Sequence, residues 1–300
     1  MNLKTTNTNM SMKRSLLIAA VAVAVCACDK EIDVDAYIPE PGEIQLDMLY
    51  PGQDTRVTGN SFDVDDKIGV YVTASDKALQ LAGNEVNNEA FAFNGESWTS
   101  SRKVYWNNGT HDIYAYYPYS ESVNDVADYS FSVQTDQSNQ SAYSQSDFLW
   151  ASKSGVTASS EPVSMQFEHK MSKVVVNLLK SESFGDDIPI PTDAEVYIMN
   201  TVPQAVVDLS TGDAAKDNFA ATEPIKCFKN GEGVYSAIVV PQSIISRRPL
   251  VEVVVGSVSY LMEGKISFRQ GYQHTINITL NQSPDKIEIS IGGQINSWDN

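Results

Sequence analysis

In IQLDMLYPG, residues 44–52, every second side chain from the first is apolar or aromatic, and a Pro-Gly pair closes the segment. Successive side chains of a β-strand point to opposite faces, so a period of two is typical of a strand with one buried face. The Pro-Gly pair indicates a turn after this strand. The predicted buried face consists of Ile44, Leu46, Met48 and Tyr50.

Further strand-like segments follow at intervals of about ten residues, with turn signals between them. In the first half they cover residues 67–73, 90–93, 103–106, 112–118, 147–151, 163–169 and 173–179. In the second half they cover residues 195–199, 204–209, 234–241, 250–255, 257–262, 272–280 and 286–291. This spacing is typical of β-sandwiches and not of βαβ units, and no apolar helix period exceeds about two turns. We therefore predict an all-β protein.

The N-terminus has the layout of a secretory signal, because basic residues precede an apolar run over residues 16–25 and acidic residues follow. The run is too short to span a bilayer, which takes about 20 residues. VCAC, residues 25–28, is typical of a lipobox, and the small Ala27 favours Cys28 as the lipid acceptor. We predict a lipoprotein signal peptide over residues 1–27 and a diacylglyceryl Cys28 that also carries palmitate.

Two other interpretations of this motif are an ordinary secretory signal with incidental cysteines and a metal or redox C-x-C pair. The second is disfavoured because no His or further Cys lies near. Cleavage before Cys28 would leave Cys227 as the one free thiol, so no disulfide within the chain is expected. Loss of the signal removes three basic residues and no acid. The remaining 18 basic and 38 acidic residues give a net charge of −20, compared with −17 for the full chain. Such a surface repels nucleic acids and anionic headgroups.

The remaining 273 residues (300 minus 27) are long enough for two domains. Residues 181–192, SESFGDDIPIPT, contain Gly, two Pro and two adjacent Asp, which indicates a junction. Residues 119–146 are rich in Ser, Asn, Asp and Gln and predict a long surface loop or weak strands. The expected organisation is an acidic tether over residues 28–42, a β-sandwich over residues 43–183 and a second β-sandwich over residues 184–300.

The sequence contains no motif of a common catalytic or phosphate-binding site. The histidines His111, His169 and His274 are far apart and have no metal-ligand spacing, which favours structural roles. The acidic cluster FDVDDKIG, residues 62–69, allows a calcium loop or, more simply, an acidic turn before a strand. Cys227 lies between lysines, but the position favours a half-buried strand residue. We predict no catalytic residue, metal or cofactor.

Four segments occur in the order found in Bacteroidales fimbrillin-like (Mfa-like) surface lipoproteins. They are TRVTGNSFDVDDKIGVYV at residues 55–72, DIYAYYPY at 112–119, DFLWA at 147–151 and VSMQFEHKMSKVVVNL at 163–178. GKISFRQGYQHTINITL and the closing INSWDN resemble the family more loosely, and CDKEID after the lipid site resembles its surface-export signal. The resemblance implies two transthyretin-like β-sandwich domains in tandem, of Greek-key type.

The resemblance also implies a role as a fimbrial (pilus) subunit, tip adhesin or anchor that acts in cell adhesion and is not an enzyme. Its expected place is the outer face of the cell outer membrane, or the fimbriae after release. The expected partners are other fimbrial subunits, the outer membrane through the lipid anchor, and an unidentified surface ligand. The alternative is a surface lipoprotein that binds glycans through exposed aromatic side chains such as Trp98, Trp106 or Trp150.

In fimbrillins, cleavage after an arginine removes the first strand and opens an apolar groove for a strand of the next subunit. The resemblance therefore implies a processing site between Arg56 and Val57, with residues 44–50 as the removable strand. Arg56 could equally be an ordinary turn arginine.

A candidate donor strand lies near the C-terminus, where three isoleucines alternate with Glu288 and Ser290. The same pattern also fits a final strand that stays in its own domain. The isoleucines of this candidate strand are Ile287, Ile289 and Ile291.

Overall fold

The computed structural model describes residues 42–52, 61–182, 190–280, 288–290 and 295–298. The all-β prediction is confirmed, because nearly every regular element in these residues is a β-strand. The one helix in the described part of the chain is α1 (Gln140–Gln145), which Asn139 caps by accepting the Ala142 N–H. None of the helices in that part is long and apolar enough to cross a membrane.

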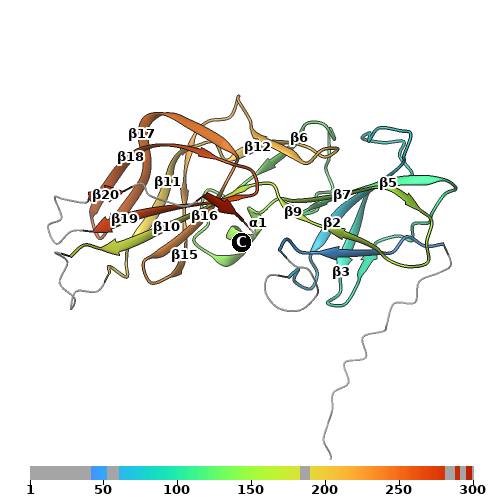
Figure 1. Cartoon of the computed structure of the whole chain (residues 1–300), viewed down its shortest axis with the longest axis horizontal. Helices are drawn as coiled ribbons and strands as arrows, with labels where there is room; N and C mark the ends of the chain where they lie inside the picture. Colours follow the sequence, from blue (N-terminus) through green and yellow to red (C-terminus); the bar gives the residue numbers. More distant parts are fainter. Residues whose placement is uncertain (1–41, 53–60, 183–189, 281–287, 291–294, 299–300) are drawn as a thin grey trace, which may run out of the picture. The chain divides into compact units, whose positions relative to one another are not determined.

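Six strands of the first half form one antiparallel sheet in the order β4-β3-β2-β5-β7-β9 (Figure 1). A separate two-stranded pair, β1 and β8, runs parallel. The bounds of the sheet strands are β4 (Trp98–Ser100), β3 (Val86–Phe93), β2 (Lys67–Ala74), β5 (Thr110–Tyr117), β7 (Leu149–Thr157) and β9 (Glu168–His169). Those of the pair are β1 (Leu46–Leu49) and β8 (Val163–Gln166).

The remaining strands of the described residues form three further sheets. The first has the order β13 (Asp213–Lys216), β12 (Gln204–Asp208) and β6 (Tyr129–Ser132). The second has the order β14 (Glu223–Lys226), β11 (Glu195–Thr201), β17 (Gln242–Val255) and β18 (Val258–Phe268). The third has the order β15 (Phe228–Gly231), β16 (Val234–Val239), β10 (Ser172–Lys180), β19 (Tyr272–Leu280) and β20 (Glu288–Ser290), and β21 (Ile295–Ser297) also pairs with β19.

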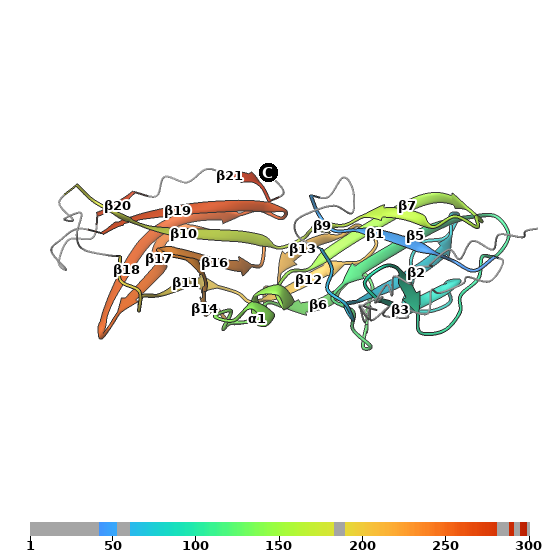
Figure 2. The same cartoon turned by 90° about the horizontal axis from the view of Figure 1, so that it is seen from below.

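The strand β10 pairs with strands that lie far beyond it in the sequence. It is antiparallel to β16 and parallel to β19, and Figure 2 shows β10 and β19 side by side. Val174, Val176 and Leu178 are buried, as the alternation along this strand requires. The pairing of β10 crosses the junction expected near residue 183, so that junction does not separate the hydrogen-bonded sheets. The division into two tandem sandwiches stays a prediction.

The buried apolar side chains of the described residues form two clusters. The smaller one gathers side chains of β1, β2, β3, β4, β5, β7 and β8 and of residues next to them, among them Ile68, Ile113 and Phe167. The larger one includes most buried side chains from β10 onward, together with Tyr116, Phe148 and other aromatic residues of the first half. The smaller cluster is the apolar floor on which β1 lies, and it positions the candidate site.

Candidate strand-exchange site

The strand β1 and the residues before it are held by backbone hydrogen bonds on two sides. Along β8 the pairing places Leu46 opposite Val163 and Met48 opposite Met165. The Val163 N–H donates to the Gln45 carbonyl at 2.9 Å, which lies just before β1. On the other side, the Ile44 N–H donates to the carbonyl of residue 104 at 2.9 Å. The segment predicted from its alternation is therefore a strand. It pairs with β8 along its length, and the residue Ile44 before it bonds to the backbone of Val104.

The apolar face of this segment is buried. The exposed fractions of Ile44, Leu46 and Met48 are 4%, 4% and 6%, and all three belong to the smaller apolar cluster. Tyr50 is only half-buried, although its ring packs against Phe62 at a centroid distance of 5.2 Å. At about 25 cal/mol per Å² of buried apolar surface, three buried aliphatic side chains stabilise the docked strand by several kcal/mol.

The floor beneath β1 is aromatic. Phe62 contacts Trp98 edge-to-face at 5.0 Å between ring centroids and Phe167 at 5.5 Å. Met165 on β8 and Val104 complete this floor, and both are almost fully buried. If β1 left, these side chains would face a groove, and β8 would lose the one hydrogen-bonded strand partner that it has among the described strands. An apolar groove beside an unpaired edge is the arrangement that accepts a strand from another chain.

Tyr50 connects the end of this segment to a cluster of polar and aromatic side chains. Its hydroxyl donates to Oδ2 of Asp147 at 3.3 Å, and Nδ1 of His169 lies 2.9 Å from Oδ1 of the same carboxylate. The ring of Trp298, just after β21, stacks on His169 at 4.0 Å. Burial, and secondly the charge of Asp147, raises the pKa of Tyr50, so its hydroxyl stays a donor. The end of the strand and the C-terminal segment thus share one cluster.

Ile289, at the middle of the candidate donor strand, lies in β20 opposite Ile278 of β19. The C-terminal segment is therefore paired with its own chain in this structure, along the edge of β19 that does not pair with β10. Ile287 and Ile291 lie outside the described residues, as do the predicted lipid site Cys28 and the predicted processing site Arg56 and Val57. Donation of this strand stays a prediction.

The histidines occupy structural positions. His111 is fully buried, with Nδ1 2.8 Å from Oε2 of Glu85, and His169 contacts Asp147 as described above. His274 is buried in β19, and its Nε2 accepts a backbone N–H at 3.0 Å. Among the residues that the structure describes, no three His, Cys, Asp or Glu side chains are grouped so that they could hold a metal ion.

Cys227 and the three tryptophans considered for glycan binding are buried or half-buried. Cys227 is buried, with an exposed fraction of 4%, and burial raises the pKa of its thiol, so it is a packed and unreactive side chain. The expectation of exposed tryptophans is wrong for Trp98 and Trp150, whose exposed fractions are 4% and 9%. Trp106 is half-buried, and its indole N–H donates to the carbonyl of Ser159. These rings do not form an exposed platform for sugars.

The sequence model of the fimbrillin-like family matches residues 55–298 of this chain. The chain belongs to the fimbrillin-like family. This membership confirms the resemblance in the four ordered segments. The strand β1 lies N-terminal to the matched residues.

Individual relatives of this fimbrillin-like chain agree with that assignment. A candidate fimbrium tip subunit of Bacteroides ovatus, Fim1C, is 30% identical over 145 residues, which are 43% of this chain and 26% of that protein. This chain thus matches about a quarter of the length of that relative.

Two solved structures, both of candidate cell adhesion proteins, share the fold. The one from Bacteroides ovatus has a TM-score of 0.68 at 22% identity, covering 87% of this chain and 99% of that chain. The one from Bacteroides uniformis has a TM-score of 0.66 at 21% identity, covering 87% of this chain and 100% of that chain.

Proposed function

We propose that this fimbrillin-like chain is a surface-exposed lipoprotein that serves as a fimbrial subunit, tip adhesin or anchor in cell adhesion. Family membership and the likeness to a candidate fimbrium tip subunit support this role. The proposal assigns no catalytic activity to the chain. The observation that carries the assembly mechanism is the burial of Ile44, Leu46 and Met48 of one short segment over an aromatic floor.

In the proposed mechanism β1 is a plug that is replaced by a strand of another subunit. The strand has four residues, and its ladder with β8 is parallel. Parallel ladders are slightly less stable per residue than antiparallel ladders, so a longer incoming strand that runs antiparallel to β8 can replace β1 with a gain in free energy. Its alternate apolar side chains would fill the positions that Leu46 and Met48 leave. The C-terminal strand with Ile287, Ile289 and Ile291 is the proposed donor.

Limited digestion with an arginine-specific protease tests this mechanism. We expect a cut after Arg56, release of the residues up to Arg56, and polymers that size-exclusion chromatography and intact mass detect. Arg102 and Arg247, with exposed fractions of 66% and 76%, could also be cut, so Arg56→Gln is the matched control that should stay monomeric. A cut after Arg56 that leaves a monomer with its first strand still bound would contradict the mechanism and favour an anchor that keeps its own strand.

The lipid anchor is proposed from the N-terminal motif and has a separate test. We expect cells to incorporate a clickable palmitate analogue into the wild-type chain and into Cys26→Ser, because Cys26 would leave with the signal. The variant Cys28→Ser should lose essentially all label and should no longer fractionate with the outer membrane. Equal labelling of Cys28→Ser and wild type would sink the assignment of this residue.

A further inference from the structure

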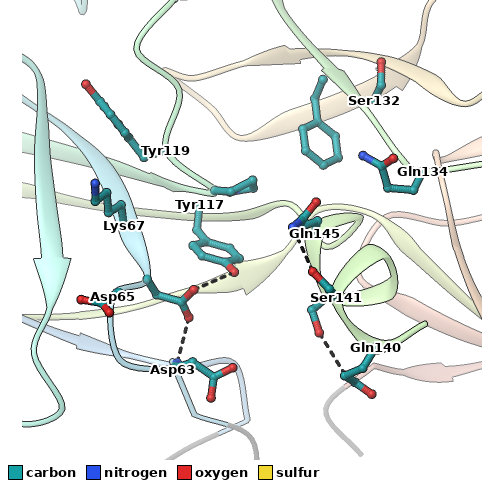
Figure 3. Close-up of a pocket in the computed structure, with 14 residues that line it drawn as sticks. Asp63, Asp65, Lys67, Tyr117, Tyr119, Ser132, Gln134, Gln140, Ser141 and Gln145 are labelled. Carbon is teal, nitrogen blue, oxygen red and sulfur yellow. Dashed lines mark hydrogen bonds between the residues drawn. The ribbon is translucent and has the colours of Figure 1, made fainter.

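A polar groove of about 900 Å³ opens between the turn before β2, the end of β5, the strand β6 and the helix α1 (Figure 3). Its volume lies at the upper end of the range usual for ligand sites. Asp63 and Asp65 lie on one side of the groove, and Gln140, Ser141 and Gln145 of α1 lie on the other. None of these residues belongs to the ladder of β1 with β8.

The first wall of the groove is acidic. The carboxylates of Asp63 and Asp65 are exposed and have no hydrogen bond or ion pair within the described residues. Asp66 is different, because its Oδ1 accepts the Tyr117 hydroxyl at 3.1 Å and its Oδ2 accepts the Asp63 N–H at 2.8 Å. These two hydrogen bonds fix the turn and the Tyr117 ring. The backbone that carries the free carboxylates of Asp63 and Asp65 is therefore held in place. Such preorganised acceptors lower the entropy cost of binding a ligand.

The second wall is uncharged. On α1 the Gln140 amide donates to the Ser144 hydroxyl at 3.0 Å, and the Gln145 amide donates to the Ser141 hydroxyl at 3.1 Å. These i to i+4 pairs orient both amides while leaving each one a carbonyl oxygen and one N–H. The exposed side chain of Gln134 adds another amide from the segment after β6. This wall can therefore donate and accept hydrogen bonds at several points.

The chemistry of both walls selects a class of ligand. Three aspartates against Lys67 disfavour a phosphorylated, sulfated or sialylated ligand. A basic peptide could pair with the aspartates, but its cations would also meet the positive charge of Lys67 in the same lining. Sugar hydroxyls both donate and accept, and the apolar face of a sugar ring packs on aromatic rings such as Tyr117 and Tyr119. We propose that this groove binds a short uncharged oligosaccharide, which would be an adhesion ligand of the chain.

The test uses the intact, uncleaved chain, so its outcome is independent of strand exchange. An array of short neutral oligosaccharides of glucose, mannose, galactose and N-acetylglucosamine is the probe, and titration calorimetry with the best binder gives the affinity. We expect Asp65→Asn and Gln140→Ala each to weaken binding at least about tenfold. Both residues are exposed, and Asn tolerates the positive φ of 73° at position 65. Glu232→Gln, an exposed acid on the turn after β15, is the matched control and should bind like the wild type.

Three results would overturn the proposal. One is no binding to any neutral oligosaccharide by the folded wild-type chain. Another is a neutral ligand whose affinity is the same in Asp65→Asn, Gln140→Ala and wild type, which would place its site elsewhere. The third is a chain that binds tetralysine or a heparin tetrasaccharide but no neutral oligosaccharide, which would assign the groove to a charged ligand. Unchanged melting curves of the variants exclude misfolding as the cause of any loss.

Discussion

Met48→Asp releases β1 from the smaller apolar cluster and exposes the groove without any proteolysis. Met48 has an exposed fraction of 6% and lies opposite Met165, so the new carboxylate would be buried without a partner. Loss of the buried side chain alone costs about 2–5 kcal/mol, and burial of the charge adds to this. Undocking of a four-residue strand relieves both costs, so we expect the rest of the chain to stay folded.

Hydrogen exchange measures this outcome. The amides of Val163 and Phe167, which donate to carbonyls of the β1 segment, should exchange far faster in Met48→Asp, and a dye that binds apolar surface should show increased fluorescence. Leu49→Asp is the matched control, because Leu49 is half-buried and points to the opposite face of the strand. If these amides exchanged as slowly in Met48→Asp as in the wild type, or if the substitution unfolded the whole chain, β1 would not be a separable plug.

Gly69→Ala is expected to be the most damaging small substitution in the first sheet. A Cβ at Gly69 would lie 2.2 Å from Cε1 of Tyr116, the residue that pairs with Gly69 across the ladder. Tyr116 cannot move aside easily, because it is 1% exposed and its hydroxyl donates to Oδ1 of Asn88 at 2.7 Å. Overpacking of this kind costs about 1–3 kcal/mol, and the lost hydrogen bond adds about 1 kcal/mol.

Urea denaturation gives the free energy of unfolding for this comparison. The control is Gly231→Ala, where the nearest atom to a new Cβ is 3.9 Å away on Val234 and no positive φ is required. We expect a clear loss for Gly69→Ala and little change for Gly231→Ala. Equal stability of the two variants would mean that the glycine does not serve to admit the Tyr116 ring.

Local pattern predicts many of the strands but not their partners, and the strand predicted over residues 103–106 is absent, since Tyr105 there forms only an isolated bridge. The period of two in residues 44–50 correctly predicts a strand with a buried face, because burial on one side imposes that period directly. The parallel pairing of β10 with β19 joins residues 100 positions apart, such as Val174 and His274, and no local pattern encodes it. For that reason a junction placed from Gly and Pro content does not coincide with the pairing of the sheets.

Some residues of polar segments have structural roles that amino-acid composition does not indicate. Gln137 lies in the segment expected as a loop or weak strands, yet it is fully buried. Its side chain forms two hydrogen bonds with the backbone of Ile238. Its amide donates to the Ile238 carbonyl at 2.7 Å, and its carbonyl accepts the Ile238 N–H at 2.8 Å. The sequence shows the acidic cluster of residues 62–69 but does not predict the groove, because the facing wall comes from the separate segment of α1.

Disulfide trapping after cleavage tests strand exchange most directly. Met165→Cys places a thiol on β8 at the position that pairs with Met48, and Ile289→Cys places one at the middle of the proposed donor strand. Cys227 is buried and does not compete. The account predicts that, after cleavage at Arg56, oxidation of the double variant gives a ladder of covalent oligomers that reductant dissolves, whereas either single variant gives none. Covalent monomers alone, with β20 still paired to its own β19, would contradict donation of the C-terminal strand to a second subunit.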